Sequence, residues 1–512
     1  MPKLQPKKQW KRLLSLRLLW TGLLLLLQVC FVLLLSAGLS GLHPAWALGL
    51  RALSSGSAVW LLSQPLHPSY KIRWVILLVL LPRSGGLFYL CFGNKRLSHH
   101  RKKVLEQYRA AALPAPQSQE LLCRLEESQP GQARLARYLQ KAAAAPLWNN
   151  TAAPYFPSGE LLFQELLQQL EGAKRFIFLE FFIVAQGELW DSILAILREK
   201  VAQGVEVRLL YDDAGSISTL PDGYEETLRG YGIRTAIFNP LRPRLNPYLN
   251  CRDHRKICVI DGELGYTGGV NLADEYVNRR ERCGHWKDGG LRLRGAAVES
   301  LCRLFLQQWQ YVTGEVQNPE PYLPWREAEA DGFVQVFGSE PISGRAVAKG
   351  AYLQLCNQAS RSLTIFSPYL IPDDETLSTL LHAAVSGVEV KLVLPHIPDK
   401  YSVHAVTRSY YSPLLKQGVR IFEYSPGFIH SKVLLADDNC AMIGSANLDY
   451  RSFYSNFECA ALLYGCSAVE EIRQDVQATL ALCQEWSLPQ AQATPWPQKL
   501  LQLLLRSLAP LM

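Results

Sequence analysis

One short pattern of chemically active residue types occurs twice in this 512-residue chain. Both copies fit H-x-K-x4-D-x6-G-[GS]-x-N without a gap, over residues 254–271 and 430–447. A lone His-x-Lys pair is common on exposed strands and would indicate little by itself. Two copies that share every fixed position predict a duplicated active site. Its members are His254, Lys256, Asp261, Gly269 and Asn271 in the first copy and His430, Lys432, Asp437, Ser445 and Asn447 in the second.

These residue types suit the transfer of a phosphate ester. Period-2 alternation places the His and Lys of each copy on one side of a strand. Each Lys supplies positive charge, and each small-residue turn allows close approach to backbone N–H donors. Such a cradle would neutralise phosphate oxygens during transfer. One histidine could attack phosphorus as a neutral imidazole while the other protonates the leaving alkoxide, so we expect no metal or other cofactor.

The paired pattern resembles the signature of the phospholipase D superfamily, and the phrases around it resemble bacterial cardiolipin synthases. Those phrases include Ser367-Pro368-Tyr369 and Asn456-Phe457-Glu458, and the likeness extends from roughly residue 70 to the end. It implies that each catalytic histidine is oriented by an acid that follows the opposite motif. Asp288 and Glu458 occupy those positions, 34 and 28 residues after the histidine of their own motif.

The resemblance also assigns a place to the aspartates of the pattern. Asp261 and Asp437 belong to the signature, but the resemblance implies that they brace the site from outside and do not touch substrate. The two equivalent histidines suggest a division of labour, and we predict that His254 is the nucleophile and His430 the acid. The halves are so similar that the opposite order stays open.

The alternation of strand and helix patterns from residue 159 onward predicts a layered α/β fold. The motif spacing and the strand order both recur, so the duplication is domain-sized. We expect two pseudo-symmetric phospholipase D-like α/β/α sandwich domains, residues 159–330 and 331–512, with the active site between them. Strands are expected at 175–184, 205–210, 363–367 and 388–394, and helices at 189–203 and 374–386.

The N-terminal part is typical of a membrane anchor. Residues 18–42 form a nearly uncharged, leucine-rich run that exceeds the ~20 residues needed to cross a bilayer. A second candidate span, 74–93, contains Pro82 and is expected to kink there. Basic clusters at 3–17 and 95–103 predict a hairpin with both ends in the cytoplasm. We therefore expect residues 1–103 to form a multi-pass plasma-membrane anchor and 104–158 a connector, with the catalytic domains in the cytoplasm.

Several segments allow two interpretations. Residues 43–66 are interrupted by Pro44, Arg51 and a Ser/Gly cluster, so an interfacial loop is favoured over a further span. The basic segment Leu241–Asn250, which the second half lacks, is either a surface loop or a contact for anionic headgroups. Residues 500–505 are expected in an amphipathic helix on the domain or lipid surface. Further candidates for a substrate contact are His285, His396, Lys400, His404 and Arg408.

The charge and cysteine content of the chain limit the partners and the compartment that can be expected. The net charge of +8 allows nucleic acid or anionic lipid, but the basic residues concentrate beside apolar segments and favour a membrane surface. The twelve cysteines lack C-x2-C spacing, which favours reduced thiols in the cytosol. No nucleic-acid partner is expected, and no oligomer is required because both motifs lie in one chain.

The resemblance implies a membrane phosphatidyltransferase. It would form a phosphatidyl-histidine from one phosphatidylglycerol, release glycerol, and pass the phosphatidyl group to a second phosphatidylglycerol to give cardiolipin. The alternatives are a phospholipase D that uses water as acceptor, a superfamily nuclease and a non-catalytic membrane-binding protein. The intact His, Lys and Asn in both copies argue against the last of these.

Overall fold

The computed structural model describes residues 43–64, 68–90, 119–241, 251–323, 328–507 and 509. The chain divides into two compact units, one made of residues 1–107 and 241–250 and the other of 108–240 and 251–512. The first is called the helical unit and the second the sheet unit. The predicted span 18–42 and the greater part of the basic segment Leu241–Asn250 lie outside the described residues.

The helical unit contains α2 (Pro44–Ser63), α3 (Pro68–Leu80) and α4 (Gly85–Phe88). The interpretation of residues 43–66 as a loop is therefore wrong. The small residues of this segment are a packing surface, since the backbone N–H of Gly86 donates to Ser54 Oγ at 2.8 Å. A Cβ at Gly86 would lie 2.9 Å from the backbone nitrogen of Ser54, so only glycine permits this approach.

The predicted second span, 74–93, is not one continuous helix where the structure describes it. Helix α3 ends at Leu80, a turn over residues 81–84 contains Pro82, and α4 follows. A proline removes a backbone donor and clashes with the preceding turn, so a break at this point has a physical cause. None of the helices in the described part of the chain is both long and apolar enough to cross a membrane.

The sheet unit contains two sheets that repeat one topology. The first has eight strands in the order β1-β10-β8-β7-β3-β4-β5, with β2 also paired to β10. The elements of this half of the chain are, in order, β1 (Thr151–Ala152), β2 (Tyr155–Phe156), α8 (Gly159–Glu171), β3 (Phe176–Phe181), α9 (Glu188–Ala202), β4 (Glu206–Asp212), α10 (Asp213–Ser216), α11 (Tyr224–Gly230), β5 (Arg234–Phe238), β6 (Arg252–Asp253), β7 (Lys256–Ile260), β8 (Leu264–Gly268), η3 (Asp274–Val277), β9 (His285–Lys287), β10 (Gly290–Gly295), α12 (Val298–Thr313) and η4 (Glu320–Tyr322).

The second sheet has nine strands, β11-β20-β18-β17-β12-β14-β15-β21, with β6 of the first half paired to β20. The stretch β20-β18-β17-β12-β14-β15 repeats β10-β8-β7-β3-β4-β5 of the first sheet. The elements of this half are β11 (Phe333–Ser339), α13 (Val347–Gln358), β12 (Ser362–Phe366), β13 (Leu370–Ile371), α14 (Asp374–Val385), β14 (Glu389–Pro395), α15 (Tyr401–Ser409), α16 (Tyr411–Lys416), β15 (Arg420–Tyr424), β16 (Gly427–Ile429), β17 (Val433–Ala436), β18 (Cys440–Gly444), β19 (Leu448–Asp449), α17 (Tyr450–Tyr454), β20 (Asn456–Tyr464), α18 (Ser467–Ala481), β21 (Cys483–Trp486), α19 (Leu488–Gln492) and α20 (Trp496–Ser507).

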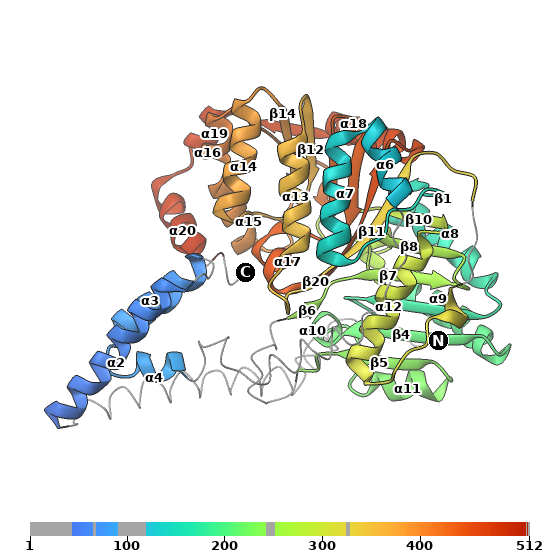
Figure 1. The fold of residues 1–512 in the computed structure, drawn as a ribbon, viewed down its shortest axis with the longest axis horizontal. Helices are drawn as coiled ribbons and strands as arrows, with labels where there is room; N and C mark the ends of the chain where they lie inside the picture. The colour runs from blue at the N-terminus through green and yellow to red at the C-terminus, as the bar shows by residue number, and fades with distance from the viewer. Residues whose placement is uncertain are drawn as a thin grey trace, which may run out of the picture. The chain divides into compact units, whose positions relative to one another are not determined.

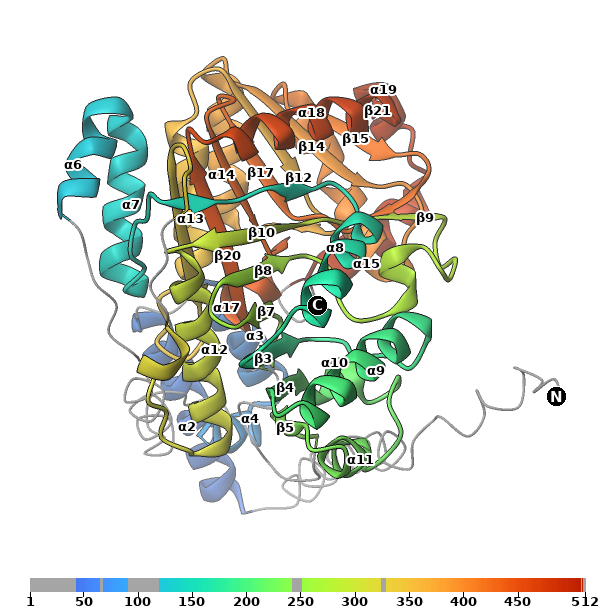
Figure 2. The same ribbon diagram turned by 90° about the vertical axis from the view of Figure 1, so that its right-hand side faces the viewer.

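Helices cover both faces of the second sheet. Figure 1 shows α13 and α14 side by side over one face, and Figure 2 shows α18 across the other. The central strands β3 and β12 are buried nearly throughout, as expected for strands covered on both sides. The layered α/β fold and its domain-sized repeat are thus confirmed, and the six strands and helices predicted individually match β3, α9, β4, β12, α14 and β14 to within a few residues.

The segment expected to connect anchor and domains takes part in both halves. Helices α6 (Gln119–Ser128) and α7 (Pro130–Ala143) pack into the core of the second half. There the side-chain amide of Gln335 donates to the carbonyls of Ala136 and Ala145 at 3.1 and 3.0 Å. Strands β1 and β2 instead pair with β10 of the first sheet.

The C-terminal amphipathic helix is present as α20. It packs beside α15, with the guanidinium of Arg506 over the ring of Tyr410 at 4.1 Å.

Two short parallel strand pairings join the two halves of the sheet unit. Strand β6 runs parallel to the start of β20, with Arg252 beside Asn456 and Asp253 beside Phe457. Strand β16 runs parallel to β9, with Ile429 beside Lys287. In each case the residue after the first strand is a motif histidine and the residue after the paired position is the acid of the opposite motif. This register brings the two halves together at the site.

Candidate active site

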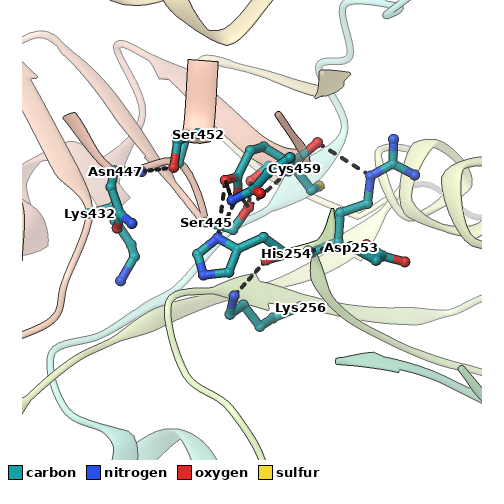
Figure 3. A network of polar contacts seen from close by, with 12 residues as sticks. Asp253, His254, Lys256, Lys432, Ser445, Asn447, Ser452 and Cys459 are labelled. Atoms are coloured by element: carbon teal, nitrogen blue, oxygen red, sulfur yellow. Dashed lines mark hydrogen bonds and ion pairs between the residues drawn. The ribbon is translucent and has the colours of Figure 1, made fainter. Parts of the chain in front are cut away.

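The first histidine is held by the acid of the second half. Next to the β6–β20 pair, the backbone N–H of His254 donates to the carbonyl of Phe457 at 2.9 Å. The ring atom Nδ1 of His254 then lies 3.1 and 3.0 Å from the two carboxylate oxygens of Glu458. A carboxylate only accepts hydrogen bonds, so Nδ1 carries the proton and the lone pair is on Nε2. Figure 3 shows this imidazole beside Ser445 and Lys256.

The second histidine mirrors this arrangement. The backbone N–H of His430 donates to the carbonyl of Lys287 at 2.7 Å. Its Nδ1 lies 2.5 Å from Asp288 Oδ2. The crossed pairs His254–Glu458 and His430–Asp288 are those that the resemblance implies.

The lysines lie behind the histidines. Lys256 Nζ donates to the carbonyl oxygen of His254 at 2.5 Å, and Lys432 Nζ donates to that of His430. Lys432 Nζ is also 2.8 Å from Nδ1 of His430, and among the described residues Lys256 makes no equivalent contact with Nδ1 of His254. The two sites are therefore related by the repeat but are not identical.

The small-residue turns position the acids. Ser445 Oγ donates to Glu458, and a Cβ at Gly269 would lie only 2.2 Å from Asp288 Oδ1. The amide N–H groups of both turn residues donate to backbone carbonyls, of Gly289 and Cys459. The expectation that these amides are offered to a phosphate is therefore not met, and the turns act through the carboxylates.

The two asparagines of the pattern reach the cavity. Asn271 accepts from the backbone of Ile183 at 3.0 Å and donates to the hydroxyl of Tyr276 at 2.8 Å. Asn447 donates to Asp449 at 3.2 Å. Both side chains are buried and fixed by these bonds.

The two aspartates of the pattern lie away from the cavity. The carboxylate of Asp261 accepts the backbone N–H groups of residues 174–176 at 2.7–2.9 Å, where β3 begins. Asp437 does the same for residues 360–362 at 2.7–3.0 Å, where β12 begins. Each aspartate therefore fixes the start of a central strand.

Burial and neighbouring charges set the protonation of the site. It lowers the pKa of His254 to about 4 and that of His430 to about 3, against the opposing effect of their carboxylates. Burial alone would raise the pKa of Glu458, but the neighbouring His254, Lys256 and Ser445 lower it to about 2. At neutral pH both imidazoles are therefore neutral and Glu458 is ionised.

The lysines are affected in the same way. Burial lowers the pKa of Lys256 to about 7 and that of Lys432 to about 8, although nearby carboxylates oppose the shift. An incoming phosphate anion would favour the charged ammonium form of both.

A cavity of about 230 Å³ joins the two histidines. Both motif asparagines line it, whereas Lys256 and Lys432 lie just behind its wall. Sequence reasoning assigned no role to the aromatic residues that shape it. Phe182 is edge-on to His254, and Tyr276 and Trp286 pack against His430, with ring centroids 5.1–5.4 Å apart. No local sequence pattern separates these three residues from ordinary core aromatics, so only the fold identifies them.

The remaining candidate residues separate into two groups. Lys400 lines the cavity, together with Arg282, Asp399 and Tyr369, to which sequence reasoning gave no role. His285 does not line the cavity, and its Nδ1 lies 3.0 Å from the hydroxyl of Tyr424. His396 and Arg408 bind the buried carboxylate of Glu423, and His404 also lies outside the cavity wall. Within the described residues no cluster of His, Cys, Asp or Glu side chains could hold a metal ion.

Comparisons with known proteins place this geometry in a family. A family model described as "Cardiolipin synthase, PLD-like domain" matches residues 166–285 and 352–480. An uncharacterized protein of Streptococcus mutans is 38% identical over 460 residues, which cover 89% of this chain and all of that protein. A cardiolipin synthase of Geobacillus kaustophilus is 37% identical over 453 residues, covering 87% and 89%. A phosphatidylserine synthase structure from Haemophilus influenzae shares the fold at a TM-score of 0.55 and 14% identity, covering 74% of this chain and 98% of that one.

Proposed function

Since the chain belongs to the cardiolipin synthase family of phospholipase D-like proteins, we propose that it transfers a phosphatidyl group from one phosphatidylglycerol to another. The products are cardiolipin and glycerol. The observation that carries this function is the pair of crossed His–acid contacts that face one cavity. This constellation supplies a nucleophile and an acid on opposite sides of a phosphodiester.

In the first step, Nε2 of His254 attacks phosphorus and forms the P–N bond of a phosphatidyl-histidine. Glu458 supports this role because it holds the proton on Nδ1 and stabilises the positive imidazole that forms. The P–O bond to glycerol breaks, and His430 gives its proton to the leaving oxygen. Lys256 and Lys432 stabilise the phosphate charge from behind the cavity wall.

The difference between the two histidines supports this order. Lys432 Nζ lies 2.8 Å from the same ring nitrogen of His430 that faces Asp288. Lys432 lowers the pKa of His430 whereas Asp288 raises it, so a bound phosphate that attracts the Lys432 ammonium would let the Asp288 carboxylate stabilise a protonated His430. His430 is then charged only when the donor lipid is bound, as an acid for the leaving group must be.

In the second step, the hydroxyl of another phosphatidylglycerol attacks phosphorus, the P–N bond to His254 breaks, and His430 takes the hydroxyl proton. Holding both lipids in one cavity gives the lipid hydroxyl a high effective concentration relative to water. Asp261 and Asp437 support the site from outside by fixing the starts of β3 and β12.

The proposal extends to the rest of the chain. Residues 1–103 anchor the protein in the plasma membrane, with a span near 18–42 and a second apolar segment, 74–93, that is broken after Leu80. The two catalytic halves are cytoplasmic. The basic clusters at 3–17 and 95–103 support this orientation. Phosphatidylglycerol and other anionic lipids are the partners.

The direct test is incubation of the purified chain with labelled phosphatidylglycerol in detergent micelles, followed by separation of the products. We expect cardiolipin and glycerol in equal amounts. Phosphatidic acid as the main product, with little cardiolipin, would make the protein a hydrolase. His254→Ala and His430→Ala proteins are the controls for product formed by a contaminant.

A further inference from the structure

The two halves differ by six residues at the wall of the cavity. The acid follows the motif histidine of the same half by 34 positions in the first half and by 28 in the second. In the repeat, η3 corresponds to α17 and β9 corresponds to the start of β20. The extra residues therefore lie in the loop of residues 278–284. This segment, called the arginine loop, contains Arg279, Arg280 and Arg282.

The arginine loop is fixed against the second half. The backbone N–H of His285 donates to the carbonyl of Pro426 at 3.0 Å, and Cys283 Sγ donates to the carbonyl of Pro398 at 3.6 Å. Gly284 has a φ of +69°, and a Cβ there would lie 2.5 Å from the carbonyl oxygen of Pro426. The loop therefore has a defined place beside the segment that leads to Lys400.

Arg282 and Lys400 line the catalytic cavity together with two hydrogen-bonding groups. Arg282 donates to Glu275 at 3.1 Å, which uses one of its five N–H groups. Tyr369 donates its hydroxyl to Asp399 at 2.7 Å, and Lys400 Nζ lies 5.7 Å from the centre of the Tyr369 ring. This part of the wall carries two cations and the carboxylate of Asp399, which suits a headgroup that carries both a phosphate and hydroxyls.

This wall is on the side of His430. The ring of Tyr276, the residue after Glu275, packs edge-on against His430 at 5.2 Å. The ring of Tyr369 lies 6.4 Å from that of Phe428, which stacks with His430. When His254 attacks from its own side, the leaving glycerol departs towards His430, and the acceptor hydroxyl must enter from the same direction.

We propose that Arg282 and Lys400 bind the phosphodiester of the acceptor lipid, while Asp399 receives a hydrogen bond from its headgroup hydroxyl. This inference rests on the proposed function. The leaving glycerol carries no second phosphate, whereas the glycerol headgroup of the acceptor is attached to the acceptor's own phosphodiester. The two cations therefore contact the acceptor and not the donor. The site selects a phosphate-bearing alcohol over water and over neutral alcohols, and the second half has no equivalent loop.

The test uses the full-length chain with labelled phosphatidylglycerol and added ethanol, which competes as a neutral acceptor. Arg282→Gln, Lys400→Met and the double variant are compared with wild type. We expect the ratio of cardiolipin to phosphatidylethanol to fall about 10-fold or more in the double variant, the scale of losing charge-assisted hydrogen bonds. Phosphatidylethanol formation itself should persist, and Arg282→Lys should recover part of the ratio.

Arg279→Gln is the matched control, because Arg279 is exposed on the same loop and does not line the cavity. Its product ratio should equal that of wild type. An unchanged ratio in the double variant, or an equal fall in all products, would overturn the acceptor site. Should Arg282→Gln fail to fold, phosphatidylethanol would be lost, and Lys400→Met at its exposed position still decides the question. A wild-type chain that makes phosphatidylethanol but no cardiolipin would instead contradict the proposed function.

Discussion

At the scale of single residues, the buried lysines set how much positive charge the site holds. Lys256→Met and Lys432→Met remove that charge and keep the side-chain stem. We expect each to lower turnover at least ~10²-fold, the scale of one preorganised stabiliser of transition-state charge. Steady-state rates with labelled phosphatidylglycerol measure this. Near-normal turnover in either variant would exclude that lysine from catalysis.

The same substitutions should not weaken the fold. The pKa of Lys256 is about 7 in the folded chain and higher in the unfolded chain. Between these values the unfolded chain binds the extra proton, so stability rises with pH across that window. Lys256→Met abolishes this dependence, and its thermal midpoint at pH 7 should equal or exceed that of wild type.

The pH profile of kcat/KM follows from the same groups, because this parameter reports the free enzyme. Above about pH 7 to 8 the lysines lose their protons and the site loses its attraction for the phosphate. Below about pH 4 the proton that His254 gains blocks its lone pair. We therefore expect a plateau between these limits and a fall on both sides. The upper limb should move when Lys256 is replaced by Met, and an unchanged upper limb would assign it to another group.

At the scale of elements, the turn after β8 supports the acid of its own half. Gly269→Ala places a methyl group where the carboxylate of Asp288 now lies. We expect a loss in kcat of at least ~10²-fold, the size of a general acid–base contribution, because His430 loses its partner. Far-UV circular dichroism should stay unchanged.

Gly230→Ala is the control for that substitution. Gly230 ends α11, and a Cβ there meets nothing within 4 Å. Its activity should remain that of wild type. A Gly269→Ala enzyme as active as Gly230→Ala would show that Asp288 has room to adjust.

Much of the α/β fold and of the paired site could be predicted from the sequence, because the same motif and strand order occur twice. Strands such as β3 and β12 have strong local patterns, and the two motifs supply each other's confirmation. The crossed strands β6 and β16 could not be found from pattern, because strands of two or three residues carry no periodicity. Their pairing depends on contacts between residues some 140 to 200 positions apart.

The residues of the cavity wall show a second limit of prediction from sequence. The aromatic rings of Phe182 and Trp286 read as ordinary core residues along the chain, and only the fold turns them towards the histidines. Likewise, Arg282 reads as one surface arginine among three. The direction in which a loop side chain points depends on how the loop packs in the fold. Sequence alone therefore could not show that Arg282 lines the cavity and Arg279 does not.

At the scale of the whole molecule, the proposed topology predicts which residues face outside the cell. Cysteines are placed at Ser55, which is exposed on α2, and at Gln5, and intact cells are treated with an impermeant thiol reagent. The hairpin predicts labelling at residue 55 and none at residue 5. Labelling at residue 5 would contradict the cytoplasmic N-terminus. Ser57 is a poorer position because its side chain is buried against the neighbouring helices.

The central claim is phosphatidyl transfer through His254, and trapping the intermediate tests it most directly. A phosphatidyl ester with a good leaving group such as p-nitrophenol needs no acid, so His430→Ala should still undergo the first step and then stall. The account predicts a burst of one nitrophenolate per chain, with the phosphatidyl group on the peptide that contains His254, and no burst from His254→Ala. A burst from His254→Ala with the adduct on His430, or turnover with no adduct in either protein, would contradict it.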